Sequence, residues 1–284
     1  MYQLSQEISI IIPCFHSNEA IKNLLITIPK KHEVVLVDNS QDEELKEIAN
    51  NYDCNLVVNK ENLGCPTAWN IGAKNATKNF FLFSNPDTLF LPNTVEELMK
   101  AVKRYPNASA FNPKIIDRNN NQHFKRRSVL MPRSEWMSRK YPNVDSEVSV
   151  LHGSAIFIKK ENFYKLKGFD EDIFLYHDDD DISIRLKKEI GPLMYINNSE
   201  IVHLSGSSSS RNKEIALIKG YHMGRSRVCM QGKHKIKGYK TKNIIFAIFQ
   251  LLSLEMLFSP RKRTKYLYFA KGVFEEIFLN KKTK

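Results

Sequence analysis

EVVLVDNSQDEELKEIANNYDCNLVVN, residues 33–59, is the stretch that decides the fold of this chain. It begins with a strand-like segment at 33–38, whose residues 34–37 are all apolar, continues with helical spacing at 41–52, and ends in a second strand-like segment at 55–59, whose residues 56–58 are all apolar. Unbroken runs of this length are typical of strands buried on both faces, and a helix between two of them favours a parallel pair. The stretch therefore predicts a strand–helix–strand unit.

The same alternation continues on both sides of this unit. We predict further strands at 8–13 and 80–84, and helices at 18–28, 65–77 and 94–105. With 284 residues, of which 42% are hydrophobic, the chain can bury a large core. The predicted fold class is therefore α/β, with a mainly parallel, Rossmann-like sheet and helices on both faces.

The second half of the chain has a less regular pattern. It predicts a strand at 149–160, a helix at 178–190, two short strands within 193–205 and a helix at 213–231. A serine-rich run at 205–210 reads as a flexible connector.

Residues 243–258 are the most apolar segment, and lysine- and arginine-rich stretches flank them. A helix that spans a membrane needs about 20 apolar residues. This segment is shorter and contains Gln250 and Glu255. It predicts either an amphipathic helix on an anionic membrane surface or an ordinary core or dimer helix.

Composition excludes several classes of protein. No GxGxxG follows the first predicted strand and no GxxxxGK[ST] is present, which argues against a dinucleotide fingerprint and a P-loop. The four cysteines form no CxxC pair and the first residues resemble no secretion signal, so we expect free thiols in a cytoplasmic protein. The net charge of +12 would suit a nucleic-acid-binding protein. However, the basic residues gather in the C-terminal tail, so we expect no nucleic-acid partner.

Polar side chains follow several predicted strands, and in a parallel sheet these ends meet at one edge. Asp38 could accept a hydrogen bond from a base or ribose, or form a turn. Asn62, Gly64 and the following helix N-terminus could approach a phosphate, with turn chemistry as the alternative. Asp87 follows Pro86 and could hold Mg²⁺ or Mn²⁺, or simply sit in a turn.

An acidic cluster lies in FDEDIFLYHDDDDISIRL, residues 169–186. Consecutive carboxylates repel one another and raise some of their pKa values, which favours a general base among them. The alternative is an acidic helix cap in which Asp181 pairs with Arg185, but it leaves 178–180 unexplained. His203 is a lone histidine, which is of interest only if the fold brings it near Asp87.

Six motifs in order together resemble family-2 glycosyltransferases of the GT-A fold, in particular the rhamnosyltransferase-like branch. They are SIIIPCF, VDNSQDE, NLGCPTAWNIG, SNPD, GFDEDIFLYHDDDDISIR and VHLSG. The similarity runs from about residue 7 to 235. It implies a GT-A catalytic domain at 1–212, with a nucleotide-binding half to about 112 and an acceptor half from about 113. Residues 213–284 would then form a helical basic region.

The resemblance also implies roles for particular residues. Asp38 would read the nucleotide base, and Asp87 and His203 would hold Mg²⁺ or Mn²⁺. Asp179 would be the catalytic base, beside Asp178 where the family has glutamate. The implied nucleotide-binding residues are Pro13, Phe15, Glu19, Asp38, Asn39, Asn62, Gly64, Asn70 and Asn85. The implied acceptor-binding residues are Gly153, Ser154 and Asp180.

The function implied by the resemblance is inverting transfer of a sugar from a nucleotide-diphosphate-sugar, dTDP-rhamnose or a UDP-sugar. The acceptor would be a saccharide or lipid-linked saccharide of bacterial surface polysaccharide: O-antigen, capsule or cell wall. The basic C-terminal helices would hold the enzyme on the inner face of the cytoplasmic membrane. A rival class, sugar-1-phosphate nucleotidyltransferase, wants a glycine-rich, arginine-bearing loop after the first strand, and PCFHSNEA at 13–20 has neither.

Overall fold

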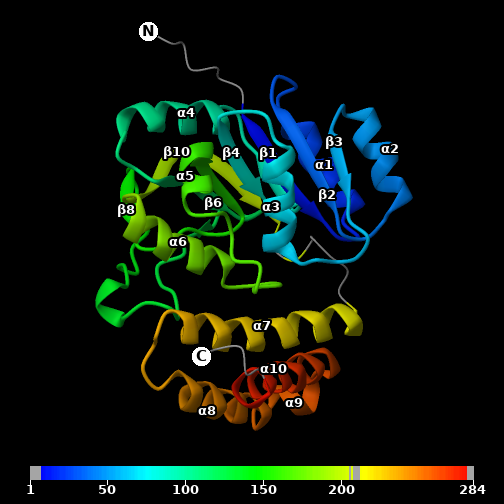
Figure 1. Ribbon diagram of the computed structural model, residues 1–284, viewed down its shortest axis with the longest axis vertical. Helices are drawn as coiled ribbons and strands as arrows, with labels where there is room; N and C mark the ends of the chain where they lie inside the picture. The colour runs from blue at the N-terminus through cyan, green and yellow to red at the C-terminus, as the bar shows by residue number, and fades with distance from the viewer. Residues whose placement is uncertain (1–7, 205, 207–211, 280–284) are drawn as a thin grey trace.

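A computed structural model of the protein describes residues 8–204, 206 and 212–279 (Figure 1). In this part of the chain one mixed sheet of ten strands has the order β3-β2-β1-β4-β9-β6-β10-β5, with β7 beside β6 and β8 beside β10. The strands are β1 (Ser9–Cys14), β2 (Glu33–Asp38), β3 (Asn55–Val58), β4 (Phe80–Ser84), β5 (Thr88–Phe90), β6 (Ala110–Ile116), β7 (Gln122–His123), β8 (Ser146–Val148), β9 (Ala155–Lys159) and β10 (Leu193–His203). The helices are α1 (Asn18–Thr27), α2 (Glu43–Asn51), α3 (Cys65–Asn75), α4 (Thr94–Arg104), η1 (Arg133–Glu135), α5 (Lys160–Lys165), α6 (Asp178–Glu189), α7 (Lys213–Lys233), α8 (Tyr239–Leu251), α9 (Glu255–Phe258) and α10 (Pro260–Phe278).

The N-terminal half of the sheet is parallel, as the sequence predicts. β1 pairs in parallel with β2 and β4, and β2 pairs in parallel with β3. Cys14, Asp38 and Val58 are register partners at the ends of their strands, so the polar residues that follow share one edge.

Helices cover both faces of the sheet, which confirms the predicted layering. One buried cluster joins the sheet to α1, α2 and α4, for example through Leu24, Ile48 and Leu98. A second cluster joins the opposite face to α3, α5 and α6, for example through Trp69 and Ile182. The sheet is thus a buried central layer, and its edges are the places left for a site.

The acceptor half of the sheet differs from the prediction in four ways. β9 runs antiparallel to both β4 and β6, so the sheet is mixed. The predicted strand at 149–160 begins only at Ala155, and the two predicted strands within 193–205 are one strand, β10. A register shift between Ile196 and Glu200 accommodates the polar residues that suggested a break. β6 was not predicted, because Asn112 and Pro113 interrupt its apolar run.

The C-terminal helices form a separate layer. In Figure 1, α7 runs beneath the sheet domain. Helices α8, α9 and α10 lie beneath α7, on the side away from the sheet. α7 and α10 cross closely because of two glycines: a Cβ at Gly224 or Gly272 would lie 2.2 Å from a backbone oxygen of the other helix.

The single helix predicted at 243–258 is wrong, because α8 ends at Leu251 and a short α9 follows. No helix in the described part of the chain is both long enough and apolar enough to cross a bilayer. The serine-rich connector predicted at 205–210 lies, apart from residue 206, outside the described residues.

Candidate active site

A cavity of about 240 Å³ opens at the carboxyl edge of the parallel strands. Its walls come from the ends of β1, β2 and β4, the loop before α3, the 174–176 loop and α7. The lining residues are Pro13, Cys14, Phe15, Asn39, Asn62, Gly64, Cys65, Asn85, Pro86, Phe174, Leu175, Tyr176, Ile215, Ile218 and Lys219. The fold thus gathers Pro13, Phe15, Asn39, Asn62, Gly64 and Asn85, all predicted to bind nucleotide, around one space.

A loop from the acidic segment at 169–186 packs against the N-terminus of α3. Gly64 has a φ of +83°, and a Cβ there would lie 2.4 Å from the Phe174 carbonyl oxygen. The Cys65 N–H donates to that carbonyl at 2.9 Å. The Phe174 ring stacks on His222 of α7, with centroids 3.9 Å apart. The C-terminal region therefore contributes directly to the cavity, although the sequence suggested a separate unit.

Three of the predicted nucleotide-binding residues do not line this cavity. Asp38 is fully buried, and its carboxylate accepts hydrogen bonds from the N–H groups of Ser40 at 2.7 Å and Asp42 at 2.8 Å. This is the turn that the sequence left open as an alternative. Glu19 is exposed on the first turn of α1. Asn70 is buried and bonds both the N–H and the C=O of Phe169, so it holds the acidic segment in place.

Asp87 and His203, the predicted metal ligands, lie together. β5 and β10 pair antiparallel with Thr88 opposite His203, and this pairing brings the Asp87 carboxylate to 3.3 Å from the imidazole Nε2. Asp87 is almost fully buried, and its C=O accepts from the Leu204 N–H at 2.8 Å.

This pair fits a divalent cation with two protein ligands. Neighbouring ligands at about 2.1 Å from an octahedral ion lie about 3 Å apart, close to the observed separation. An imidazole beside a carboxylate suits Mn²⁺ as well as Mg²⁺. The part of the chain that the structure describes contains no group of three or more His, Cys, Asp or Glu side chains that could hold a metal.

The loop at 152–154 joins this pair to the acidic helix. β4 pairs antiparallel with β9, and the Asn85 N–H donates to the Ser154 carbonyl at 3.0 Å. The His152 ring packs against His203 with centroids 5.7 Å apart. The Gly153 N–H donates to the Asp179 carboxylate at 2.9 Å, and a Cβ at 153 would lie 3.0 Å from that oxygen. The predicted acceptor-binding glycine thus touches the predicted base.

The four consecutive aspartates at the start of α6 have different environments. Burial, followed by the charge of Asp179, raises the pKa of Asp178 to about 7. Asp179 and Asp180 both pair with Lys125, at 2.6 and 2.7 Å. Burial opposes ionisation of Asp180, but Lys125 and His177 outweigh it and lower the pKa of that carboxyl.

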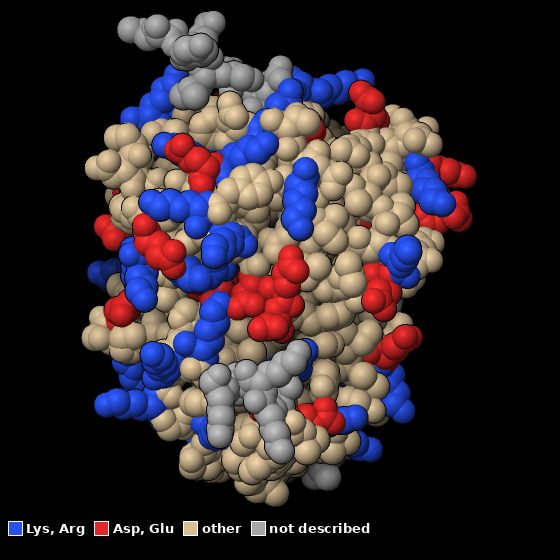
Figure 2. Space-filling view, viewed as in Figure 1, with Lys and Arg blue, Asp and Glu red and all other residues tan. Residues whose placement is uncertain are grey.

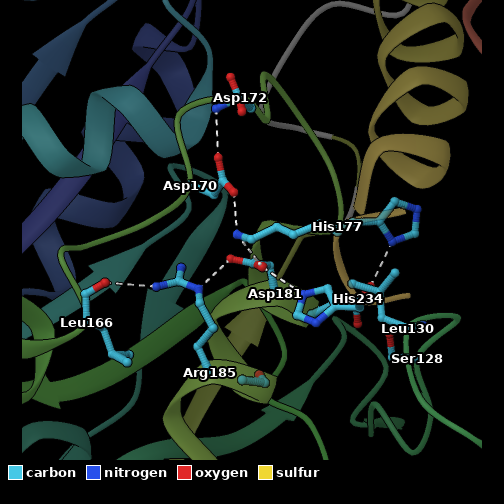
Figure 3. A network of polar contacts seen from close by, with 12 residues as sticks. Ser128, Leu130, Leu166, Asp170, Asp172, His177, Asp181, Arg185 and His234 are labelled. Carbon is cyan, nitrogen blue, oxygen red and sulfur yellow. Dashed lines mark hydrogen bonds and ion pairs between the residues drawn. The ribbon is translucent and has the colours of Figure 1, made fainter. Parts of the chain in front are cut away.

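The fourth aspartate ties α6 to the end of α7 (Figure 3). Asp181 has no exposed side-chain surface and accepts from the Arg185 Nε at 2.7 Å, as the alternative i+4 reading expected. It also pairs with His234 at 2.8 Å and Lys233 at 3.0 Å. Lys233 reaches Asp170 as well. This network, and not catalysis, explains the last acid of the run.

Sequence reasoning missed two residues of the site, Lys125 and His152. Lys125 lies in a stretch without periodicity, and nothing local connects it to an acid 54 positions later. His152 did carry a signal, since it directly precedes the predicted acceptor loop and is a titratable group beside a strand.

The mixed sheet, the helices on both faces and the cavity at the strand ends define an α/β protein with a cavity at the carboxyl edge of its sheet. Residues 9–167 match the family model for Glycosyl transferase family 2. Because this match covers more than half of the 284 residues, the chain belongs to glycosyl transferase family 2.

Curated relatives agree with the family. The chain is 27% identical over 150 residues to the N-acetylglucosaminyl-diphospho-decaprenol L-rhamnosyltransferase of Mycobacterium tuberculosis, covering 46% of this chain and 48% of the relative. It is 26% identical over 193 residues to the low-salt glycan biosynthesis hexosyltransferase Agl10 of Haloferax volcanii, covering 64% and 62%. The match thus spans only about half to three-fifths of these relatives' own length.

Solved structures share the fold. The mannosyltransferase PcManGT from Pyrobaculum calidifontis, in complex with GDP-Man and Mn²⁺, superimposes with a TM-score of 0.58 at 15% identity, covering 96% of this chain and 88% of that one. TarS 1–349 from S. aureus gives a TM-score of 0.55 at 16% identity, covering 98% and 93%. The predicted GT-A fold with added C-terminal helices is therefore confirmed.

Proposed function

We propose that the protein is a metal-dependent, inverting glycosyltransferase that moves a sugar from a nucleotide-diphosphate-sugar to a saccharide acceptor. One observation carries this proposal. The Asp87–His203 pair lies beside the loop whose Gly153 N–H holds the Asp179 carboxylate, and Asn85 links that loop to the cavity. The candidate metal ligands, the candidate base and the cavity therefore lie along one edge of the sheet.

The cavity would hold the nucleotide, with the diphosphate directed toward Asp87 and His203. A divalent cation on that pair would stabilise the negative charge that develops on the leaving diphosphate. The buried Asp87 carboxylate directly precedes β5 and the half-buried His203 imidazole ends β10, so the paired strands would hold both side chains in place for such a group. The mannosyltransferase PcManGT, which shares this fold and was solved with GDP-Man and Mn²⁺, supports a divalent metal here.

The acidic turn of α6 would supply the base. The acceptor hydroxyl attacks the anomeric carbon from the face opposite the diphosphate, and its proton passes to a carboxylate, Asp179 or its neighbour Asp178. The new C–O bond forms as the bond to phosphate breaks, and the diphosphate leaves with the electron pair. Attack from the opposite face inverts the anomeric centre. The Gly153 N–H orients the Asp179 carboxylate, and Lys125 balances its charge between turnovers.

The donor and acceptor classes are part of the proposal. We propose dTDP-rhamnose or a UDP-sugar as donor and a saccharide, in particular a lipid-linked one, as acceptor in bacterial surface polysaccharide synthesis. The similarity to an L-rhamnosyltransferase named for N-acetylglucosaminyl-diphospho-decaprenol supports rhamnose and a lipid-linked acceptor. The family match favours this class over the nucleotidyltransferase and nucleic-acid-binding alternatives.

The C-terminal helices would hold the protein on an anionic membrane at the cytoplasmic side. Large apolar side chains on α8 and beyond are exposed: Phe249 by 69%, Leu252 by 76% and Phe258 by 82%. Basic residues surround them at 235–242 and 261–265. Exposed apolar groups with a basic border are typical of helices that lie in the headgroup region.

The proposal is tested with a panel of nucleotide-sugars, measuring thermal shift and donor hydrolysis with and without Mn²⁺ or Mg²⁺. We expect one donor to raise the melting temperature only when the metal is present. Asp87→Asn should remove that metal dependence, whereas Asp179→Asn should keep donor binding and lower turnover at least about 100-fold. Equal metal-dependent shifts in wild type and Asp87→Asn would refute the metal assignment.

A further inference from the structure

Three arginines surround one tryptophan in the segment before β8. The guanidinium carbons of Arg126, Arg127 and Arg133 lie 5.9, 5.0 and 5.6 Å from the centroid of the Trp136 ring. We call these four residues the arginine–tryptophan cluster. Arg127 and Arg133 are exposed, and Arg126 is half-buried.

The charge of this cluster is not balanced by the protein. Residues 123–140 contain six lysines and arginines and one acid, Glu135, which pairs with Lys187 of α6 at 3.4 Å. Among the described residues, no carboxylate forms an ion pair with any of the three arginines. The Trp136 Nε1–H is covered by neighbouring atoms and has no acceptor in the described part of the chain.

This donor set suits a phosphate group. Arginine presents a planar fork of N–H donors that matches phosphate oxygens, and several forks around one point strengthen the attraction. The aromatic ring fixes the guanidinium groups by cation–π contact without neutralising them. The cluster therefore has the composition of an anion-binding site. Arginines that are already paired with carboxylates would not offer their charge to a ligand in this way.

The loop that carries the cluster is firmly anchored. The Met137 N–H donates to the Arg126 carbonyl at 2.9 Å, which closes the loop. The Ser149 hydroxyl donates to the Glu135 carbonyl at 2.6 Å, and the Gln231 side chain of α7 donates to the Val129 carbonyl at 3.2 Å. The loop thus rests against the end of α7, where the chain turns into the helices that we place on the membrane.

The cluster is adjacent in the chain to Lys125, the residue that pairs with the candidate base Asp179. Lys125, which pairs with Asp179 at 2.6 Å, directly precedes Arg126, and Arg127 lies at most about 7 Å of extended backbone beyond Lys125. In the view of Figure 2, lysine and arginine side chains gather on the left of the molecule, and a group of acidic side chains lies near its centre. A ligand that reached both the arginine–tryptophan cluster and Asp179 would carry an anionic group at one end, for the arginines, and a hydroxyl group at the other, for the carboxylate.

We propose that the arginine–tryptophan cluster binds the phosphate or diphosphate of the acceptor, so that the acceptor sugar lies over Asp179. This inference rests on the proposed function, and it deepens it by assigning a phosphate-bearing acceptor to this site. The phosphate would lie near the bilayer surface, because the same loop contacts the end of α7. Bulk anionic headgroups share this chemistry, and the test separates them from a diphosphate.

The test measures binding of the full chain to three probes in EDTA. They are phosphatidylcholine vesicles containing farnesyl diphosphate, phosphatidylcholine–phosphatidylglycerol vesicles of equal surface charge, and inorganic pyrophosphate. Arg127→Gln/Arg133→Gln is compared with Lys103→Gln/Arg118→Gln, which removes the same charge from exposed positions outside the cluster. Circular dichroism and melting temperature verify that both variants fold.

We expect the cluster variant to lose at least about tenfold in affinity for the diphosphate vesicles and less than about twofold for the phosphatidylglycerol vesicles. Pyrophosphate should compete with the diphosphate vesicles in wild type and not in the cluster variant. Equal losses of affinity of the cluster variant for both kinds of vesicle would mean general headgroup binding and would overturn the inference. Unchanged affinity of the cluster variant for the diphosphate vesicles would also overturn it, and so would an equal loss in the control variant. Wild type that binds nucleotide-sugar with Mn²⁺ but not diphosphate would refute this inference alone. Diphosphate binding without nucleotide-sugar binding would instead refute the proposed function.

Discussion

Asp181→Asn is the substitution whose effect the structure defines most closely. The Asp181 carboxylate is fully buried and lies between Arg185, His234 and Lys233, at 2.7, 2.8 and 3.0 Å. Burial opposes its ionisation, but the hydrogen bond from His234 and the charges of Arg185 and Lys233 outweigh burial and lower the pKa of Asp181 from 3.8 to about 2. A shift of this size corresponds to about 2 kcal/mol of stability at neutral pH. Since the amide also leaves two cations, Arg185 and Lys233, without their common charged partner, a loss of at least about 2 kcal/mol is expected.

The pH dependence follows from the direction of the shift. A carboxylate with a lowered pKa in the folded state contributes its full stability above its unfolded pKa, near 4, and loses it as the pH falls through about 2. The difference between wild type and Asp181→Asn should therefore be constant from pH 7 to about pH 5. It should narrow below about pH 4.

The assay is urea unfolding followed by far-UV circular dichroism at pH 7, 5 and 3. Glu44→Gln is the control, because its ion pair with Lys22 is about half exposed on both sides and should contribute nothing measurable. Asp181→Asn should also weaken nucleotide-sugar binding, because α7 supplies Ile215 and Ile218 to the cavity wall. An unchanged unfolding midpoint at pH 7 would refute the reasoning, and so would a difference that grows as the pH falls from 4 to 3.

Three further predictions concern the cavity, the base and the membrane. Burial and the charge of Asp179 raise the pKa of Asp178 to about 7, so wild-type turnover should rise as the pH increases through about 7. Asp178→Asn should lose this rise in the pH–rate profile. A profile that keeps the rise would contradict the assignment of Asp178 as the group whose ionisation controls turnover. Gly64→Ala should lower donor affinity at least about tenfold by calorimetry, since its Cβ would meet the Phe174 carbonyl at 2.4 Å. Gly238→Ala is the control, with a φ of +67° but no atom nearer than 3.8 Å, and equal effects of both variants would count against steric closure of the loop. Phe249→Ser/Leu252→Ser should reduce co-sedimentation with phosphatidylglycerol vesicles several-fold. The control Ile26→Ser, which removes an apolar side chain exposed by 70% on α1, should not reduce it. Unchanged co-sedimentation of the Phe249→Ser/Leu252→Ser variant would exclude the C-terminal helices as the membrane-binding face.

Local patterns predicted the nucleotide-binding half of the fold well. β1 to β4 are unbroken apolar runs, and α1 to α4 have clear helical spacing, so each element is visible within its own residues. The motif order also placed the candidate acids at the ends of these strands. β6 was not predicted because Asn112 and Pro113 interrupt the apolar pattern of this buried strand. α8 and α9 were predicted as one helix because apolar residues continue across the break at 252–254.

The sequence by itself determined the parallel strand–helix layering and the identity of the acids that follow the strands, because both are properties of neighbouring residues. Only the tertiary structure decided that His203 meets Asp87, that Lys125 pairs with Asp179, and that α7 forms a wall of the cavity. The first contact comes from antiparallel pairing of β5 with β10, and the others join segments separated by tens of residues. Such contacts depend on how whole elements pack, and no local periodicity specifies which distant partner a buried charge will find.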